Sequence, residues 1–205
     1  MTNRLPIIGI TGGIGSGKSV VANILRENGC VVADADANTK EIIERKEVQQ
    51  QLIEWWGEKV MGQDGNIDRS LIASIVFSEE NERNKLESLI HPLVRSLQEK
   101  AFENAPKDSI ALVIDAPLLM ESGLDKECDV VIFVDSSFET RLKRVVSTRA
   151  WDEEQLRLRE DVQIGLDKKR SSADYIVIND GDIAYIEQQT RSVLSLIRNS
   201  IRSSK

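Results

Sequence analysis

A glycine-rich stretch near the N-terminus constrains the fold more than any other part of the sequence. Residues 9–21 read GITGGIGSGKSVV and directly follow the apolar run Leu5–Ile8. Within this stretch, Gly12–Ser19 match G-x-x-x-x-G-K-[ST] at every fixed position, a pattern that needs a strand before it and a helix after it. Such a loop turns backbone N–H groups inward to form an anion nest, and the following helix adds its positive N-terminal end. The stretch therefore predicts a site for the phosphates of a nucleotide.

Two side chains of the loop have expected roles. Lys18 can reach the β- and γ-phosphates, and the hydroxyl of Ser19 can bind Mg²⁺. Three uses of the phosphates are compatible with the loop alone: transfer to a substrate, hydrolysis that drives a switch, and hydrolysis that drives a machine. The predicted nucleotide contacts along the loop are Gly13, Ile14, Gly15, Ser16, Gly17, Lys18, Ser19 and Val20.

Short apolar, β-branched runs recur along the chain, and helical stretches separate them. Such runs are typical of parallel strands that are covered on both faces. The alternation of strands and helices predicts an α/β fold. The expected strands are Pro6–Thr11, Cys30–Asp34, Ile110–Asp115, Val130–Asp135 and Tyr175–Asn179.

The segments between these runs are expected to be helical. The first helix should begin in the glycine loop and run to about Glu27, and Asp68 is an expected N-cap of a later helix. His91 precedes Pro92, which favours an extended kink at this point. Further helices are expected at Ser137–Asp167, as a charged pair with a break near Ala150–Asp152, and at Ile183–Arg202.

Composition and charge narrow the possible functions. The chain has 205 residues and a formal net charge of −7, which argues against nucleic-acid binding, because that role needs a basic face. No apolar run is long enough to span a bilayer, and the N-terminal segment lacks the apolar core of a secretory signal. Cys30 and Cys128 are expected to be free thiols in a reducing compartment. We therefore expect a cytoplasmic protein without nucleic-acid or membrane partners, either a monomer or a weak homo-oligomer.

Other parts of the sequence bear on how the phosphates are used. A GTP switch needs an Asn-Lys-x-Asp element after a strand, whereas the nearest stretch, Asn84–Glu87, ends in Glu inside a helical pattern. A mechanical ATPase usually needs a longer chain. A short chain with a helical insert and a basic helical pair favours a small-molecule kinase, whose lid excludes water. A nucleotide-dependent binding protein without a phosphoryl acceptor is the alternative from a different class.

A kinase of this kind needs a carboxylate near the acceptor hydroxyl. Asp34 ends the second expected strand, at the edge where ligands bind in open α/β sheets, and can accept the hydroxyl proton or orient the hydroxyl. Asp36 fits a helix cap better. Asp115 and Asp135 each end a later strand, and the pattern alone does not decide which of them is the acid of a Walker B strand.

Several motifs together resemble the dephospho-CoA kinase family. The glycine loop alone is generic, and the other motifs are far more specific in combination. They follow the family's order from residue 7 to about residue 181. These motifs are Asp34-Ala35-Asp36, Gly65–Arg69, His91-Pro92, the D-x-P-L-L-x-E-x-G pattern of Asp115–Gly123, and the Q-x5-K-x3-A-D pattern of Gln163, Lys169, Ala173 and Asp174.

The resemblance implies the last step of coenzyme A synthesis, in which ATP, with Mg²⁺, phosphorylates the ribose 3′-hydroxyl of dephospho-CoA to give CoA and ADP. It also implies a three-layer P-loop NTPase fold with a five-stranded parallel sheet. The whole chain, 1–205, would form a single domain with its core at about 1–36, 107–136 and 173–205. A helical substrate-binding region would occupy about 37–106, and a two-helix lid about 137–172.

The same resemblance implies roles for particular residues. Lys18, Asp34 and Arg144 would be catalytic, with Asp34 as the base or as the group that positions the hydroxyl. Arg144, Arg149 and Asn179 would join the loop in binding ATP, and Asp115 would be favoured over Asp135 as the acid of the site. The expected substrate contacts are Asp34, Lys40, Arg69, His91, Asp115, Leu118, Glu121 and Gly123.

Three places depart from the family pattern. Asn38 and Lys40 stand where the family has an apolar residue and then Arg or His, and lysine lacks the planar fork of arginine. Arg141 stands in place of Gln at the start of the lid, where it would add a phosphate contact or be solvated. Trp151 replaces a small or glycine-containing turn, and a packing role is the only one that we expect for it.

Overall fold

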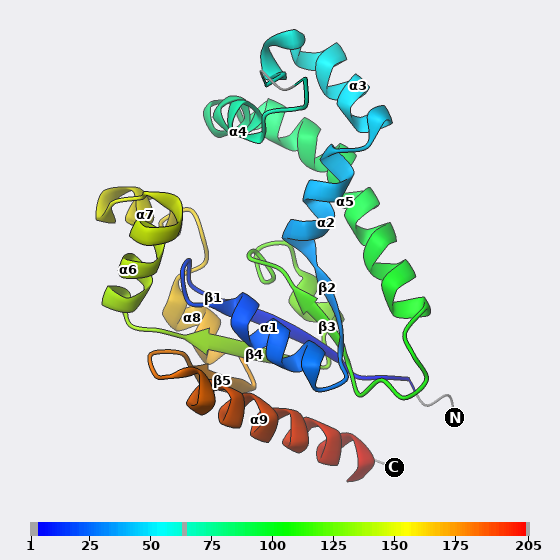
Figure 1. Ribbon diagram of the computed structural model, residues 1–205, viewed down its shortest axis with the longest axis vertical. Coiled ribbons are helices and arrows are strands. Elements are labelled where there is room, and N and C mark those ends of the chain that lie inside the picture. Colours follow the sequence, from blue (N-terminus) through cyan, green and yellow to red (C-terminus); the bar gives the residue numbers. More distant parts are fainter. Residues whose placement is uncertain (1–3, 63–64, 204–205) are drawn as a thin grey trace. The chain divides into compact units, whose positions relative to one another are not determined.

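The computed structural model describes residues 4–62 and 65–203 and consists of two compact units (Figure 1). The first unit contains the chain up to Asp34 and the chain from Asn104 onward, and the second is Ala35–Glu103. The sheet and the glycine loop belong to the first unit. The second unit is helical, with one isolated antiparallel bridge between Met61 and Ile67.

The first unit is built on a five-stranded parallel sheet with the strand order β2-β3-β1-β4-β5. The predicted fold class, an α/β fold on a five-stranded parallel sheet, is therefore confirmed. β1 is the central strand and leads directly into the glycine loop. The strands are β1 (Ile7–Gly12), β2 (Val31–Asp34), β3 (Leu112–Asp115), β4 (Val130–Asp135) and β5 (Tyr175–Ile178).

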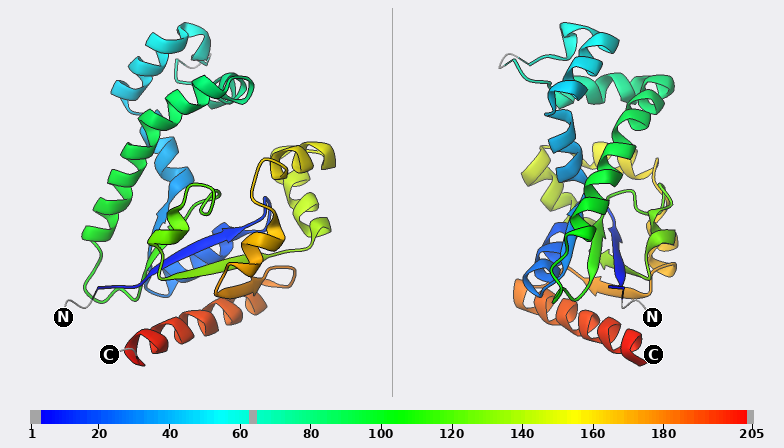
Figure 2. Two further views of the ribbon diagram at one scale, coloured as in Figure 1. Left: turned by 180° about the vertical axis from the view of Figure 1, so that it is seen from behind. Right: turned by 90° about the vertical axis from the view of Figure 1, so that its right-hand side faces the viewer.

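Helices cover both faces of this sheet, which explains why the strands are apolar almost throughout. Helices α1 (Lys18–Glu27) and α9 (Ile183–Ser203) pack together on one face. Helix α8 (Leu166–Ser171) contacts β1 and β4 on the other face, as the view from behind shows (Figure 2). α1 ends at Glu27 with Asn28 as its C-cap, and Gly29 follows with a φ of 86°. The core between α1, α9 and the sheet includes Ile8, Ile10, Val21, Leu25, Val113, Ile132, Val177, Leu194 and Ile197.

Two of the helices between β4 and β5 form the predicted charged pair, although the second ends at Glu160 and not at the expected Asp167. Helix α6 (Phe138–Arg149) begins after Ser137, whose hydroxyl accepts a hydrogen bond from the N–H of Thr140. Helix α7 (Glu153–Glu160) begins with a capping box between Asp152 and Gln155. The break falls where it was predicted, with Ala150 in the left-handed region at a φ of 54°. Helix α8 was not predicted, because six residues are too few to show a helical period.

The second unit has a hydrophobic core of its own. Asp68 caps helix α4 as predicted, since its carboxylate accepts the N–H of Ser70 at 2.8 Å. The helices of this unit are α2 (Ala35–Ile43), α3 (Lys46–Trp56), α4 (Arg69–Ser78) and α5 (Glu80–Glu103), with a 3₁₀ turn, η1, at Glu58–Val60. Its buried core residues are Ile42, Ile43, Val48, Leu52, Trp56, Val60, Ile72 and Ile90.

The predicted kink before Pro92 is wrong. Helix α5 runs without interruption through Pro92, although proline provides no N–H for the carbonyl of Ser88. Ile90 is buried in the core of this unit, and Leu93 packs against that core. Packing on both sides of the proline therefore maintains the helix, and His91 lies within it.

Both cysteines are free thiols, as predicted. Burial raises the pKa of Cys30 to about 11 and, together with nearby acidic groups such as Asp125, that of Cys128 to about 12. Both thiols are therefore protonated at neutral pH. Among the described residues, no helix is both long and apolar enough to cross a membrane.

Candidate active site

The glycine loop connects the end of β1 to the start of α1, as its motif requires. Gly17 precedes α1 in the left-handed region, with a φ of 84°. A Cβ at this position would lie 2.1 Å from the side-chain nitrogen of Asn179, so only glycine fits here. The Nζ of Lys18 donates to the carbonyl oxygens of Gly12 at 3.1 Å and Gly13 at 3.2 Å, which holds the ammonium group at the loop.

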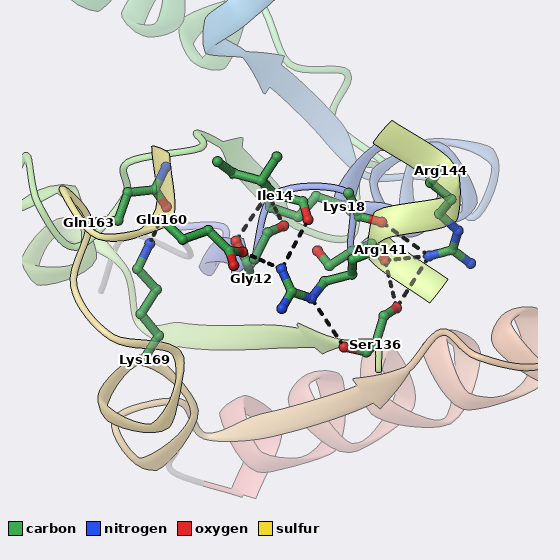
Figure 3. Close-up of polar contacts among 12 residues, drawn as sticks. Gly12, Ile14, Lys18, Ser136, Arg141, Arg144, Glu160, Gln163 and Lys169 are labelled. Carbon is green, nitrogen blue, oxygen red and sulfur yellow. Dashed lines mark hydrogen bonds and ion pairs between the residues drawn. The ribbon is translucent and has the colours of Figure 1, made fainter. Parts of the chain in front are cut away.

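Two arginines of α6 bind carbonyl oxygens of the loop (Figure 3). The NH1 of Arg144 donates to the carbonyls of Gly15 at 3.3 Å and Ser16 at 3.1 Å. The NH1 of Arg141 donates to the carbonyl of Ile14 at 3.3 Å. In a trans peptide unit the C=O and N–H bonds point in opposite directions. The N–H groups of these peptide units therefore point away from the arginines. That of Ser16 donates to the carbonyl of Gly13 at 3.1 Å within the loop, so the N–H groups of Gly15 and Gly17 are the ones of this set that we expect to face an anion.

Asn179, which follows β5, supports the loop in this structure. It is 1% exposed, and its Nδ2 donates to the carbonyl of Ser16 at 2.7 Å. Its backbone and side-chain oxygens accept from the NH2 of Arg144 at 2.8 and 3.1 Å. The hydroxyl of Ser136, which follows β4, donates to the carbonyls of Asn179 at 2.9 Å and Ser16 at 3.1 Å. These bonds tie the ends of β4 and β5 to the loop, and contact between Asn179 and ATP stays a prediction.

Asp34 and Asp115 lie side by side at the carboxyl edge of the sheet. They are register partners in the parallel pair of β2 and β3, and Asp115 is also paired in register with Ile10 of the central strand. Asp115 is 8% exposed. Asp135, at the end of β4, forms an ion pair with Arg170 in which Nε and Oδ2 are 3.3 Å apart. The sheet register thus places Asp115, and not Asp135, beside Asp34, a choice that the strand pattern alone left open.

The loop after β3 carries three predicted substrate contacts. Leu118 is 45% exposed, and Gly123 begins the 3₁₀ turn η2 (Leu124–Glu127) with a φ of 76°. Glu121 forms an ion pair with the fully buried Lys169 of α8, with Oε1 and Nζ 2.7 Å apart. Lys169 also donates to the side chain of Gln163 at 3.1 Å. Two motifs that are distant in the sequence therefore meet around the buried Lys169, a contact that was not predicted from the sequence.

Two opposing effects act on the Glu121 carboxyl. Burial alone raises its pKa, but the hydrogen bond and charge of Lys169 and the N–H of Ile164, at 3.0 Å, together hold the pKa below its ordinary value of 4.5. Folding therefore favours the ionised form, and the pair contributes its full stability above pH 4.5. That contribution decreases as the pH falls through the lowered pKa.

Replacing Lys169 with methionine is expected to lower the free energy of unfolding by about 3–5 kcal/mol at neutral pH, because the Glu121 charge would lose its buried partner. Urea unfolding measures the change, and the difference from the unsubstituted protein should shrink once Glu121 is protonated. Lys168→Met is the matched control, since Lys168 lies on the same helix and is exposed. Equal effects of the two substitutions would contradict this account of the cluster.

Trp151 joins the two helices of the charged pair. Its ring centroid lies 4.8 Å from the guanidinium carbon of Arg149 at the end of α6 and 4.0 Å from that of Arg159 in α7. Such contacts contribute about 0.5–1 kcal/mol each at exposed sites. The large side chain in this turn thus has a role beyond packing. Arg159 was not among the predicted site residues. It lies in the last turn of α7, two positions after Arg157, which is also basic.

The expectation that Arg141 is solvated is wrong, because the residue is 4% exposed. Its guanidinium forms an ion pair with Glu160 at the end of α7.

The remaining predicted substrate contacts belong to the helical unit. Lys40, Arg69 and His91 are all exposed there and lie on α2, α4 and α5 respectively.

A parallel sheet whose central strand feeds a G-x-x-x-x-G-K-[ST] loop defines a P-loop protein, and solved kinases share this fold. The shikimate kinase of Aquifex aeolicus has a TM-score of 0.53 with 19% identity, over 95% of this chain and 98% of that one. A crystal structure from Thermus thermophilus has a TM-score of 0.81 with 32% identity, over 94% and 98%. The dephospho-CoA kinase of Campylobacter jejuni has a TM-score of 0.68 with 25% identity, over 95% and 98%. The fold is therefore that of a P-loop kinase.

Sequence comparison identifies the family. The family model "Dephospho-CoA kinase" matches residues 6–185. The dephospho-CoA kinase of Fusobacterium nucleatum is 37% identical over 177 residues, which cover 86% of this chain and 91% of the relative. That of Thermobifida fusca is 34% identical over 197 residues, which cover 96% and 98%. The chain belongs to the dephospho-CoA kinase family, as its motifs predicted.

Proposed function

We propose that the protein transfers the γ-phosphoryl group of ATP to the ribose 3′-hydroxyl of dephospho-CoA, giving CoA and ADP. The observation that carries this proposal is the family match over residues 6–185. The phosphate-binding loop after the central strand, which lies within the matched residues, also supports it. This reaction is the final step of CoA synthesis, and we propose that it takes place in the cytoplasm.

We assign the ATP phosphates to the glycine loop. Its inward N–H groups and the N-terminus of α1 attract anions, and Lys18 supplies a positive charge for the β- and γ-phosphates. Phosphoryl transfer depends mainly on positioning and charge neutralisation. Arg144 contributes by holding the loop carbonyls, and Arg149 adds a guanidinium at the end of α6.

We assign Mg²⁺ to the Ser19 hydroxyl. Among residues 4–62 and 65–203, no group of three or more His, Cys, Asp and Glu side chains forms a metal cage. This fits Mg²⁺, which binds few protein oxygens and keeps waters and substrate phosphates as its other ligands. Ser19 is exposed in the first turn of α1 and offers the hard oxygen that this ion prefers. When bound, Mg²⁺ would neutralise charge on the β- and γ-phosphates.

We assign the acceptor hydroxyl to Asp34, which would take its proton or orient it, with Asp115 beside it. Leu118 and Gly123 would line the acceptor side of the β3 loop, and Glu121 would hold this loop in shape through Lys169. Lys40, Arg69 and His91 of the helical unit would bind the remainder of dephospho-CoA. We further propose that α6 and α7 form a lid that excludes water.

A product assay tests the proposed reaction. Incubation with Mg-ATP and dephospho-CoA should yield CoA, detected by mass, and ADP should be released only when dephospho-CoA is present. Phosphorylation of a different alcohol, with no CoA formed, would contradict the proposal. ADP release that depends only on a protein partner would instead favour a nucleotide-dependent binding protein.

A further inference from the structure

Arg141 contacts three parts of the first unit with one guanidinium (Figure 3). Its Nε donates to the carbonyl of Ser136 at the end of β4, at 3.3 Å. Its NH1 donates to the carbonyl of Ile14 in the phosphate-binding loop, at 3.3 Å. The same NH1 forms an ion pair with Glu160, the last residue of α7. The loop and the lid helix are therefore held by the same group.

This junction is buried, which makes its parts depend on one another. The Arg141 side chain is 5% exposed and the Glu160 side chain 18%. A buried charge that loses its partner is strongly unfavourable, so Arg141 and Glu160 are expected to stay together. By contrast, the pair of Arg157 and Glu153 on the same helix α7 is 59% and 54% exposed, and pairs of that kind contribute little.

The loop also lies tightly against this arginine. A Cβ at Gly13 would lie 3.0 Å from the NH1 of Arg141, and a Cβ at Gly15 would lie 2.8 Å from its carbonyl oxygen. The guanidinium of Arg141 thus packs against Gly13, and the backbone of Arg141 packs against Gly15, so movement of the side chain would change the surroundings of Gly13. The loop carbonyl of Ile14 would lose its donor at the same time.

We propose that Arg141 is a positioning residue that couples lid helix α7 to the phosphate-binding loop through Glu160. When α7 is in place, Glu160 holds the guanidinium against the loop, and the loop is ordered to receive phosphates. When the pair is broken, both the order of the loop and the position of α7 are lost. This inference deepens the proposed function, because the role of the loop in binding nucleotide rests on it.

A double-mutant cycle on ADP affinity tests the coupling. Titration calorimetry with Mg-ADP compares the unsubstituted protein with Arg141→Gln, Glu160→Gln and the double variant. Each single substitution should weaken ADP binding by roughly tenfold, and the double variant should be no weaker than the weaker single one, because coupled residues are not additive. Glu153→Gln, which breaks the exposed pair on the same helix, should leave the affinity unchanged.

Two further readouts separate positioning from a purely structural role. Arg141→Lys should recover part of the ADP affinity that Arg141→Gln loses, and only while Glu160 is present. Glu160→Gln should also raise the ratio of ATP hydrolysed by water to dephospho-CoA phosphorylated, because a displaced α7 excludes water less well. If Arg141→Gln does not fold, the cycle is run with Arg141→Lys in its place.

The proposal would be overturned if the two substitutions acted independently. The double variant would then bind ADP roughly a hundredfold more weakly, which is the product of two tenfold losses. Unchanged ADP affinity in variants whose unfolding midpoint falls would also overturn it, since the pair would then serve stability alone. ADP binding needs no acceptor. A protein that binds ADP but does not phosphorylate dephospho-CoA would therefore contradict the proposed function while the cycle still decides the coupling.

Discussion

Replacing Lys18 with alanine is expected to lower kcat/KM by roughly a hundredfold or more, which corresponds to a loss on the order of 3 kcal/mol of transition-state stabilisation. Negative charge on the transferred phosphoryl group is neutralised by fixed positive groups, and the loop holds this ammonium at its own carbonyls. Steady-state kinetics with both substrates varied measures the loss.

A matched lysine on helix α6 controls for the loss of a positive charge. Lys143 lies on α6 and is exposed, so Lys143→Ala should leave kcat/KM almost unchanged. Thermal unfolding of both variants checks that the fold is intact. A folded Lys18→Ala variant whose kcat/KM stays within about threefold, a change below 1 kcal/mol, would show that the ammonium does not stabilise the transition state.

Asp34→Asn should lower kcat by about 10²–10⁴-fold, the range that positioned general bases contribute, and should change ATP affinity by far less. The amide has nearly the same shape as the carboxylate but cannot accept the hydroxyl proton as a base. Single-turnover experiments together with a separate ATP titration distinguish the two effects. A collapse of ATP binding, with turnover of bound substrates preserved, would show that the assigned role is wrong.

Asp135→Asn is the matched control for this experiment. Asp135 ends a strand of the same sheet, but it pairs with Arg170 and is opposite Ile178 in the register. Its replacement should leave turnover nearly unchanged. The comparison also tests directly which strand-ending acids belong to the site, a question that the strand pattern alone left open.

The parts of the fold that could be predicted from the sequence depend on local chemistry. A buried parallel strand needs a nearly continuous apolar run, which identified the five strands. Asp68 and the break near Ala150 were likewise predictable, because capping and turn formation involve residues close together in the chain. The prediction of a kink at Pro92 was wrong for the opposite reason, since packing against the core of the helical unit outweighed the local preference of proline.

The candidate site divides in the same way. The loop and its lysine were evident from spacing, because a phosphate nest is built from consecutive residues. The contacts of Arg141 with Glu160, of Glu121 with Lys169 and of Trp151 with Arg159 join separate elements. Spacing carries no signal for such pairs, although Arg141 and Trp151 were visible as departures from the family pattern.

By itself, the sequence determined an α/β protein with a phosphate-binding loop and, through its motifs, the kinase family to which the chain belongs. Only the tertiary structure decided which side chains support the loop and which acid stands beside Asp34. The physical reason is that strand order and helix packing bring together residues more than a hundred positions apart, such as Ile14 and Arg141. Burial then makes those contacts strong by removing the water that would compete for them.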